Sequence, residues 1–224
     1  MKRNGGLQTG AALALALLLL ASSLTGCGER QGGAGAGPDG PVNTYMPEVN
    51  DDGYIVLTMP QTLLGGVTAE ELEAEDKAAR AEIEDEKMLS RTFYSALLAN
   101  ADGTFSYYLT PEQYPKFQAG LYWLGCLRDP HTTEISQEFV KDTEYTDFDE
   151  NGIPWGLVVA VDAETYNSLE IWYSALATVV PAVFLGRYQV TCGVPGERWA
   201  VHVTVKDAET GETILENDFP AQDG

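Results

Sequence analysis

The chain has 224 residues, of which 44% are hydrophobic and 21% charged, enough for one globular domain of ordinary size. Thirteen Lys and Arg stand against 34 Asp and Glu, so the formal net charge at pH 7 is −21. Nucleic acid and anionic lipid headgroups repel such a chain, so nucleic acid is not an expected partner. Membrane attachment therefore requires a lipid or an apolar segment. Two histidines leave little for His-based metal or acid–base chemistry.

The N-terminus has the pattern of a secretory signal. Lys2 and Arg3 supply two positive charges, and residues 11–21 form an unbroken apolar run. A membrane-spanning helix needs about 20 apolar residues, roughly twice the length of this run. The sequence therefore predicts a signal peptide rather than a permanent transmembrane helix.

The residues that follow, Leu24-Thr25-Gly26-Cys27, resemble the lipobox of bacterial lipoproteins. In that family the Cys thiol receives a diacylglyceryl group, the preceding peptide is removed, and the new N-terminus is often acylated, for example with palmitate. The resemblance implies that Cys27 is the lipidation site and anchors the chain to the extracytoplasmic face of the cell membrane. Two or more acyl chains, each contributing about 0.8 kcal/mol per buried methylene, give a stable anchor. A secreted protein with an incidental Cys27 is the alternative.

Residues 28–47 read GERQGGAGAGPDGPVNTYMP, which is rich in Gly and Pro and nearly free of bulky apolar side chains. About 20 flexible residues span roughly 25 Å, enough to hold a domain clear of lipid headgroups. We therefore expect a signal peptide over 1–26, a lipid-anchored tether over 27–48 and a single domain over 49–224.

In the first half of the domain, a turn at 50–53 precedes a predicted strand over 54–59. Thr68-Ala69-Glu70-Glu71 is a capping box, which predicts a helix from Ala69. This helix is highly charged to Arg91, and its last third is expected to pack through Phe93, Leu97 and Leu98.

A second turn at 100–103 precedes a predicted strand over 104–109. Thr110-Pro111-Glu112-Gln113 then predicts a helix that ends by Asp129-Pro130 and is weakened by Pro115 and Gly120.

In the second half, the pattern predicts strands over 139–145 and 155–161, the latter buried on both faces. A core helix over 163–180 follows, broken by Pro181 and Gly186. Further strands are predicted over 188–191 and 199–205, with a hairpin turn at 207–211 leading into 213–215. The order of elements predicts an α+β domain with three helices packed on a mainly antiparallel sheet.

The domain resembles a family of uncharacterised lipoproteins of Gram-positive gut bacteria. The resemblance implies a surface-exposed, lipid-anchored α+β domain, and it carries over no catalytic or ligand-binding residues. The chain departs from that family in its longer, more charged first helix and in Pro115. The matching features are Met59 to Gly66, the Thr68 capping box, the stretch from Asn100 to the helix at Thr110, Val161-Asp162 before a Tyr-containing helix, and the turn from Asp207 to Glu212.

The stretch from Asp147 to Gly152 fits the first six positions of a calcium-binding loop. Position twelve should be a bidentate Glu, but it is Val158. The pattern favours a polar turn over a weak surface calcium site, and no metal site is expected.

Cys126 and Cys192 remain once Cys27 is lipidated. A disulfide between them would close a loop of about 66 residues and stabilise the fold by roughly 4 kcal/mol. Their apolar surroundings favour the alternative, two buried thiols. A catalytic pairing of Cys192 with His202, or of Cys126 with His131, lacks any local motif.

The sequence contains no nucleophile elbow, phosphate-binding loop or zinc-protease motif, so no catalytic residue and no cofactor is expected. The favoured function is a non-catalytic module that binds a protein partner or acts as an envelope scaffold. A ligand-binding module for glycan or calcium is the alternative, with Tyr108, Trp123 and Trp172 as candidate stacking faces. A hydrolase built from dispersed carboxylates is the third reading.

Overall fold

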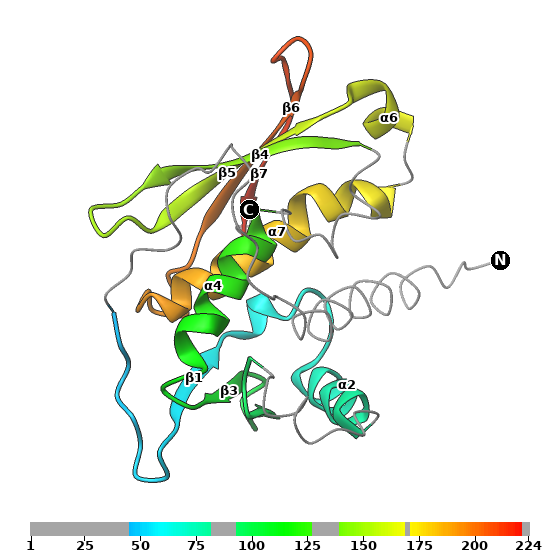
Figure 1. Ribbon diagram of the computed structural model, residues 1–224. Helices are drawn as coiled ribbons and strands as arrows, with labels where there is room; N and C mark the ends of the chain where they lie inside the picture. The colour runs from blue at the N-terminus through cyan, green and yellow to red at the C-terminus, as the bar shows by residue number, and fades with distance from the viewer. Residues whose placement is uncertain (1–44, 82–92, 127–138, 169–170, 221–224) are drawn as a thin grey trace, which may run out of the picture.

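The computed structural model describes residues 45–81, 93–126, 139–168 and 171–220. The predicted signal peptide, Cys27 and the tether to residue 44 lie outside the described residues. Within those residues, four α-helices and two sheets form an α+β fold, which confirms the predicted class. The helices α7 and α4 lie between the two sheets (Figure 1). Buried side chains from both sheets and from the helices form one hydrophobic core.

The smaller sheet has three antiparallel strands in the order β1 (Ile55–Met59), β3 (Phe105–Leu109), β2 (Ala96–Ala99). The predicted strands over 54–59 and 104–109 are confirmed. The strand β2 corrects the expectation that Leu97 and Leu98 end the first helix. Leu97 is buried and Leu98 exposed, as in a strand with one covered face, and such a short apolar run does not distinguish strand from helix.

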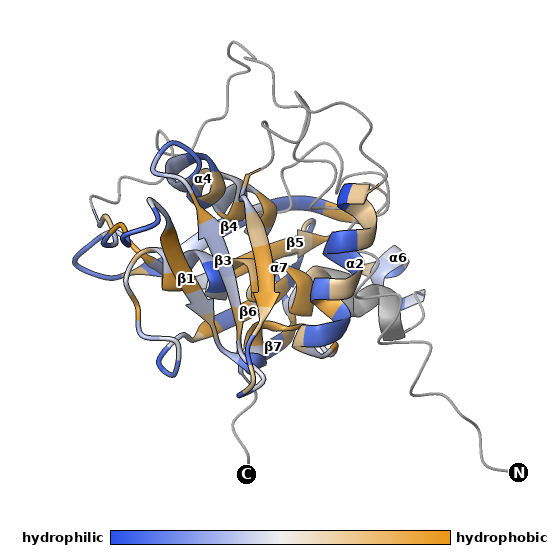
Figure 2. Cartoon of the chain, turned by 90° about the horizontal axis from the view of Figure 1, so that it is seen from below, coloured by the Kyte–Doolittle hydropathy of each residue, from blue (hydrophilic) through white to orange (hydrophobic). Residues whose placement is uncertain are grey.

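The helix α2 (Ala69–Ala81) begins at the predicted capping box. The Thr68 N–H donates to Glu71 Oε2 over 2.9 Å, and the Glu71 N–H donates to Thr68 Oγ1 over 3.1 Å. At the side of β2, the Ala99 N–H donates to the Glu73 carboxylate over 2.6 Å, so α2 covers this sheet edge. Figure 2 shows large hydrophilic areas on α2, whereas β1 is mainly hydrophobic.

The helix α4 (Tyr114–Gly125) follows a second confirmed box, in which the Thr110 N–H donates to Gln113 Oε1 over 2.9 Å. Pro115 lies in the first turn, where its missing N–H costs no helical hydrogen bond. The expectation that Pro115 weakens this helix is therefore wrong. The Tyr114 hydroxyl bonds the carbonyl of Thr191 on α7. A Cβ on Gly125 would overlap the Tyr145 hydroxyl, which donates to the Tyr122 carbonyl over 2.6 Å, so this glycine leaves the space that the hydroxyl occupies.

The larger sheet is mixed, in the order β4 (Val140–Phe148), β5 (Pro154–Val161), β6 (Val201–Asp207), β7 (Thr213–Phe219). The outer pairs are antiparallel, but β5 and β6 are parallel. The crossover between them contains α6 (Ala163–Ser168) and α7 (Ile171–Thr191). Along β5, buried residues alternate with partly exposed Val158 and Ala160, so this strand is not buried on both faces as predicted.

The helix α7 continues through Pro181 and Gly186, and residues 188–191 are helical rather than a strand. Both results correct the sequence prediction. A helix-interior proline costs about 3 kcal/mol, but from Ala177 to Cys192 every side chain except Val179 is buried. Burial at about 1.5–3 kcal/mol per large apolar side chain outweighs that cost. Among the described residues, no helix is long and apolar enough to cross a membrane.

Candidate functional site

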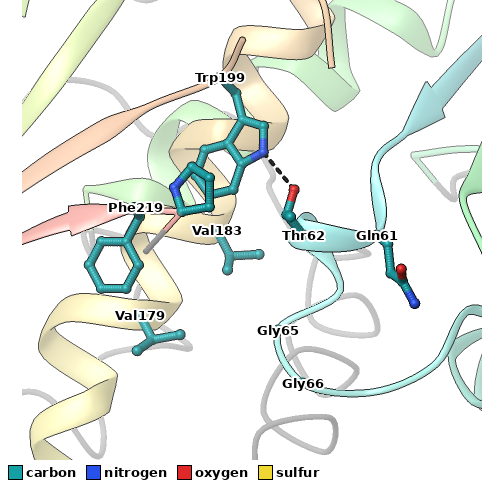
Figure 3. Close-up of a pocket in the computed structure, with 9 residues that line it drawn as sticks. Gln61, Thr62, Gly65, Gly66, Val179, Val183, Trp199 and Phe219 are labelled. Atoms are coloured by element: carbon teal, nitrogen blue, oxygen red, sulfur yellow. Dashed lines mark hydrogen bonds between the residues drawn. The ribbon is translucent and has the colours of Figure 1, made fainter. Parts of the chain in front are cut away.

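A groove of about 500 Å³ lies between α7 and the segment that follows β1. In Figure 3, Val179 and Val183 of α7 and Phe219 of β7 face the segment that carries Thr62, Gly65 and Gly66. The volume falls in the range of small-ligand sites. The lining residues are Gln61, Thr62, Gly65, Gly66, Val179, Val183, Trp199, Phe219 and Pro220.

Trp199 closes one part of the groove and is held by two neighbours. Its indole Nε1–H donates to Thr62 Oγ1 over 2.9 Å, and the side chain is only 4% exposed. A Cβ on Gly186 would lie 2.5 Å from Trp199 Cε3 and 2.7 Å from Leu63 Cδ2. The glycine inside α7 therefore leaves the space that the indole occupies.

The segment that forms the opposite wall is attached to α7 through a buried arginine. Arg187 is 4% exposed, and its Nε and Nη2 donate to the carbonyl of Leu63 over 3.2 and 2.8 Å. Leu63 belongs to the short 3-10 helix η2 (Gln61–Leu63). Arg187 Nη1 bonds the hydroxyl of Tyr107 over 3.2 Å. Burial raises the pKa of Tyr107, although the nearby guanidinium opposes the rise.

No carboxylate of the described residues forms an ion pair with Arg187. Its guanidinium carbon lies instead 5.2 Å from the ring centroid of Phe105 and 5.9 Å from that of Phe184. Behind the groove wall, the fold thus holds a buried positive charge that hydrogen bonds and aromatic faces stabilise.

Gly65 and Gly66 continue the wall in a turn that only glycine forms without strain. Their φ angles are 69° and 98°, and Leu64 before them is right-handed helical with φ −80° and ψ −16°. A right-handed residue followed by a left-handed one has the backbone conformation of an anion-binding nest. Neither the Gly65 N–H nor the Gly66 N–H donates to a described residue.

The side chains that line the groove are mainly apolar. None of its nine lining residues has a side chain that titrates between pH 2 and 12 or acts as an activated nucleophile. Its polar side chains are the Gln61 amide and the Thr62 hydroxyl, which accepts from Trp199. In the glycine turn, the Leu64 N–H donates to the Gln61 carbonyl over 3.1 Å, which leaves the N–H groups of Gly65 and Gly66. The arrangement fits an apolar ligand with a small polar group.

The aromatic residues predicted to stack on a glycan are not brought together here. Trp123 lies on α4 and is 40% exposed, whereas Tyr108 lies on β3, with its ring edge-on to Tyr54. The side chain of Trp172 lies outside the described residues. The groove aromatics Trp199 and Phe219 were not predicted as site residues, because Trp199 lies on the apolar side of the alternating strand predicted over 199–205 and so reads as an ordinary core position.

The turn that resembles a calcium loop uses its carboxylates locally. Asp149 Oδ1 accepts from the N–H groups of Asn151 and Ile153 over 2.8 and 2.9 Å. Burial raises the pKa of Asp149, but these backbone hydrogen bonds together lower it by more, so the pKa lies below its usual value. Asp147 Oδ2 lies 3.1 Å from Thr146 Oγ1. The described residues include no group of three His, Cys, Asp or Glu that could hold a metal ion.

Cys126 and Cys192 are both buried and are not joined by a disulfide, which is the second of the two arrangements that the sequence allowed. Cys192 Sγ accepts from Gln118 Nε2 over 3.6 Å, whereas Cys126 caps the far end of α4. Eight helical residues, about 12 Å, separate Gln118 from Cys126. His202 bonds Asp218 through Nδ1 over 2.7 Å on the larger sheet. His131 lies outside the described residues.

No protein-family model matches the chain, and no significant match is found among curated proteins or solved structures. The functional argument therefore rests on the groove and on the N-terminal sequence.

Proposed function

We propose that this chain is a bacterial lipoprotein, anchored through Cys27 to the extracytoplasmic face of the cell membrane, whose domain is a non-catalytic ligand-binding module. The observation that carries the binding role is the apolar groove at Trp199, which contains unpaired N–H donors but no catalytic side chain. The lipobox-like residues before Cys27 support the anchor.

The charge and the tether are consistent with this placement. A net charge of −21 repels the domain from anionic lipid, so the acyl chains and not the protein surface hold the chain at the membrane. The Gly- and Pro-rich residues 28–47 give the domain reach, and the groove stays accessible to solutes outside the cell.

The groove favours an apolar small molecule over a glycan. A glycan presents many hydroxyl groups that need partners, and burying them without partners is costly. Of the lining side chains, only the Gln61 amide is a polar group without a hydrogen bond among the described residues. Binding of a protein partner is the second candidate function, because the side chains of Trp123 and Phe148 are 40% and 49% exposed.

The anchor is tested with Cys27→Ala in the native host. Labelled palmitate should mark the wild-type chain and not the variant, and the variant should leave the membrane fraction or accumulate as uncut precursor. Cys126→Ala, which removes a thiol elsewhere, should keep both label and membrane location. An unlabelled wild-type chain that still fractionates with membrane would refute the lipid anchor.

The groove is tested with the full lipidated chain in phospholipid nanodiscs, with empty nanodiscs as the blank. Fluorophenylbutanol, an uncharged apolar probe, is followed by fluorine NMR. Val179→Trp should fill the groove and weaken binding about tenfold or more. Leu98→Trp places the same indole on the exposed side of β2 and should change nothing. Equal binding by both variants would show that the groove is not the binding site.

A further inference from the structure

We infer that the groove selects a small amphiphilic carboxylate, whose apolar body lies against Val179, Phe219 and Trp199 and whose carboxylate is bound by the N–H groups of Gly65 and Gly66. This inference rests on the proposed binding function and names the ligand class of the same site.

The first argument is the presence of two adjacent backbone donors without acceptors. Gly65 and Gly66 both line the groove, and neither N–H has a partner among the described residues. The preceding Leu64 gives the loop the alternating conformation that directs successive N–H groups into one concavity. A carboxylate has two oxygens and accepts from two such donors, and hydrogen bonds to a charged acceptor are the strong ones.

The buried charge behind this wall of the groove is positive. Arg187 holds its positive charge behind the same wall, bonded to the Leu63 carbonyl and unpaired with any described carboxylate. Although the protein as a whole is acidic, no Asp or Glu lines the groove. The nearby Glu71 carboxylate is bound to the Thr68 N–H in the capping box of α2. Among the described side chains that build this wall, the charged one is therefore a cation, which favours an anionic ligand.

The third argument is the scarcity of other polar groups. The Thr62 oxygen accepts from Trp199, which leaves its O–H as one further donor, so a ligand with several polar groups along its length would leave most of them unpaired. A peptide backbone has such groups at every residue, and a fatty or aromatic carboxylate has none beyond its head group. The walls therefore fit a hydrocarbon or ring body with one anionic end.

The test compares fluorophenylbutyrate with fluorophenylbutanol near pH 7, again on the full chain in nanodiscs. The two probes share the apolar body and differ only in the charged head. The carboxylate should bind about tenfold more tightly than the alcohol, as a net gain from charge-assisted hydrogen bonds predicts.

Gly66→Asp and Gly66→Asn form a matched pair at the proposed carboxylate position. A Cβ on Gly66 meets nothing within 4 Å, so there is room for either side chain. The φ of 98° strains any residue other than glycine, but Asp and Asn share that strain, so the comparison between them isolates the charge. Gly66→Asp should weaken binding of the carboxylate about tenfold or more by charge repulsion, and Gly66→Asn by less than about threefold. Alcohol binding should be the same in both variants.

The outcomes separate this inference from the binding function. If the alcohol binds as tightly as the carboxylate, or if Gly66→Asn weakens the carboxylate as much as Gly66→Asp, the carboxylate site is refuted while the groove remains a binding site. If Val179→Trp weakens neither probe, the binding function itself fails.

Discussion

At the scale of single residues, Gly186 joins the groove to the core. Its missing side chain accommodates both the Trp199 indole and the Leu63 side chain. In an exposed helix, Gly→Ala would stabilise by about 1 kcal/mol. Here the added methyl overlaps both neighbours, and overpacking of this kind typically costs about 1–3 kcal/mol. We therefore predict that Gly186→Ala lowers the midpoint of chemical denaturation and weakens binding of fluorophenylbutanol. A raised midpoint would show that the indole moves aside at little cost.

Glu73 provides a prediction with a defined pH dependence. A hydrogen bond from Lys77, followed by the Ala99 N–H, lowers its pKa in the folded state. A lowered folded-state pKa stabilises the protein above the unfolded-state value of about 4.3, and this contribution disappears as the pH falls through the folded-state value.

Glu73→Gln should therefore cost under about 1 kcal/mol near neutral pH, because its partner Lys77 is 65% exposed and solvent screens the ion pair, although Glu73 itself is only 19% exposed. The cost should disappear at an acidic pH below the folded-state pKa, where Glu73 itself is protonated. Urea denaturation at both pH values measures the difference, with Glu209→Gln in an exposed turn as the control. A cost that is the same at both pH values would indicate that the side-chain shape, not its charge, matters.

At the scale of elements, local chemistry determined most of what the sequence predicted correctly. The boxes at Thr68 and Thr110 involve groups three residues apart, and both form as predicted. The prediction failed where tertiary burial decides. Pro181 and Gly186 are helix breakers by propensity, but the surrounding stretch is buried against α4 and both sheets, so α7 continues.

The candidate site could not be predicted from the sequence, because it too depends on tertiary packing. Gly65-Gly66 is a visible turn signal, but its free N–H groups become a site only when Val179 and Trp199 arrive from elements more than a hundred residues away. Neither hydrophobic periodicity nor motif spacing predicts that these residues lie next to the glycine turn. A buried Arg187 without a carboxylate partner is likewise a property of the packed fold.

The central position of α7 leads to a stability prediction. The apolar pattern over 163–180 predicts that Leu169 and Leu176 lie in the core, but residue 169 and the Leu176 side chain lie outside the described residues. Leu185 on the same helix is fully buried. Leu185→Ala should cost about 2–5 kcal/mol through lost burial and a residual cavity. Leu98→Ala, at an edge position that is 37% exposed, should cost under about 1 kcal/mol. Equal urea midpoints for the two variants would show that α7 does not lie at the centre of the core.

At the scale of the whole molecule, the two sheets bracket α7, and the groove opens where this helix meets the segment after β1 and the end of β7 (Figure 1). Contacts of the domain also extend back to Tyr45, whose carbonyl accepts from the Tyr114 hydroxyl over 3.2 Å. The last residues of the expected tether therefore touch the domain. The groove wall joins segments from both ends of the domain, so ligand binding there should stabilise the fold as a whole.

The net charge of −21 leads to the last prediction, which separates general screening from specific cation binding. Self-repulsion destabilises a highly charged compact state, so raising NaCl from about 20 mM to about 300 mM should raise the thermal midpoint of the full chain. Calcium at a few millimolar should act no differently from magnesium at the same ionic strength. The reason is that Asp149 already accepts from Asn151 and Ile153, and position twelve of the loop is Val158. A midpoint several degrees higher in calcium than in magnesium, lost in Asp147→Ala, would instead establish a calcium site at this turn.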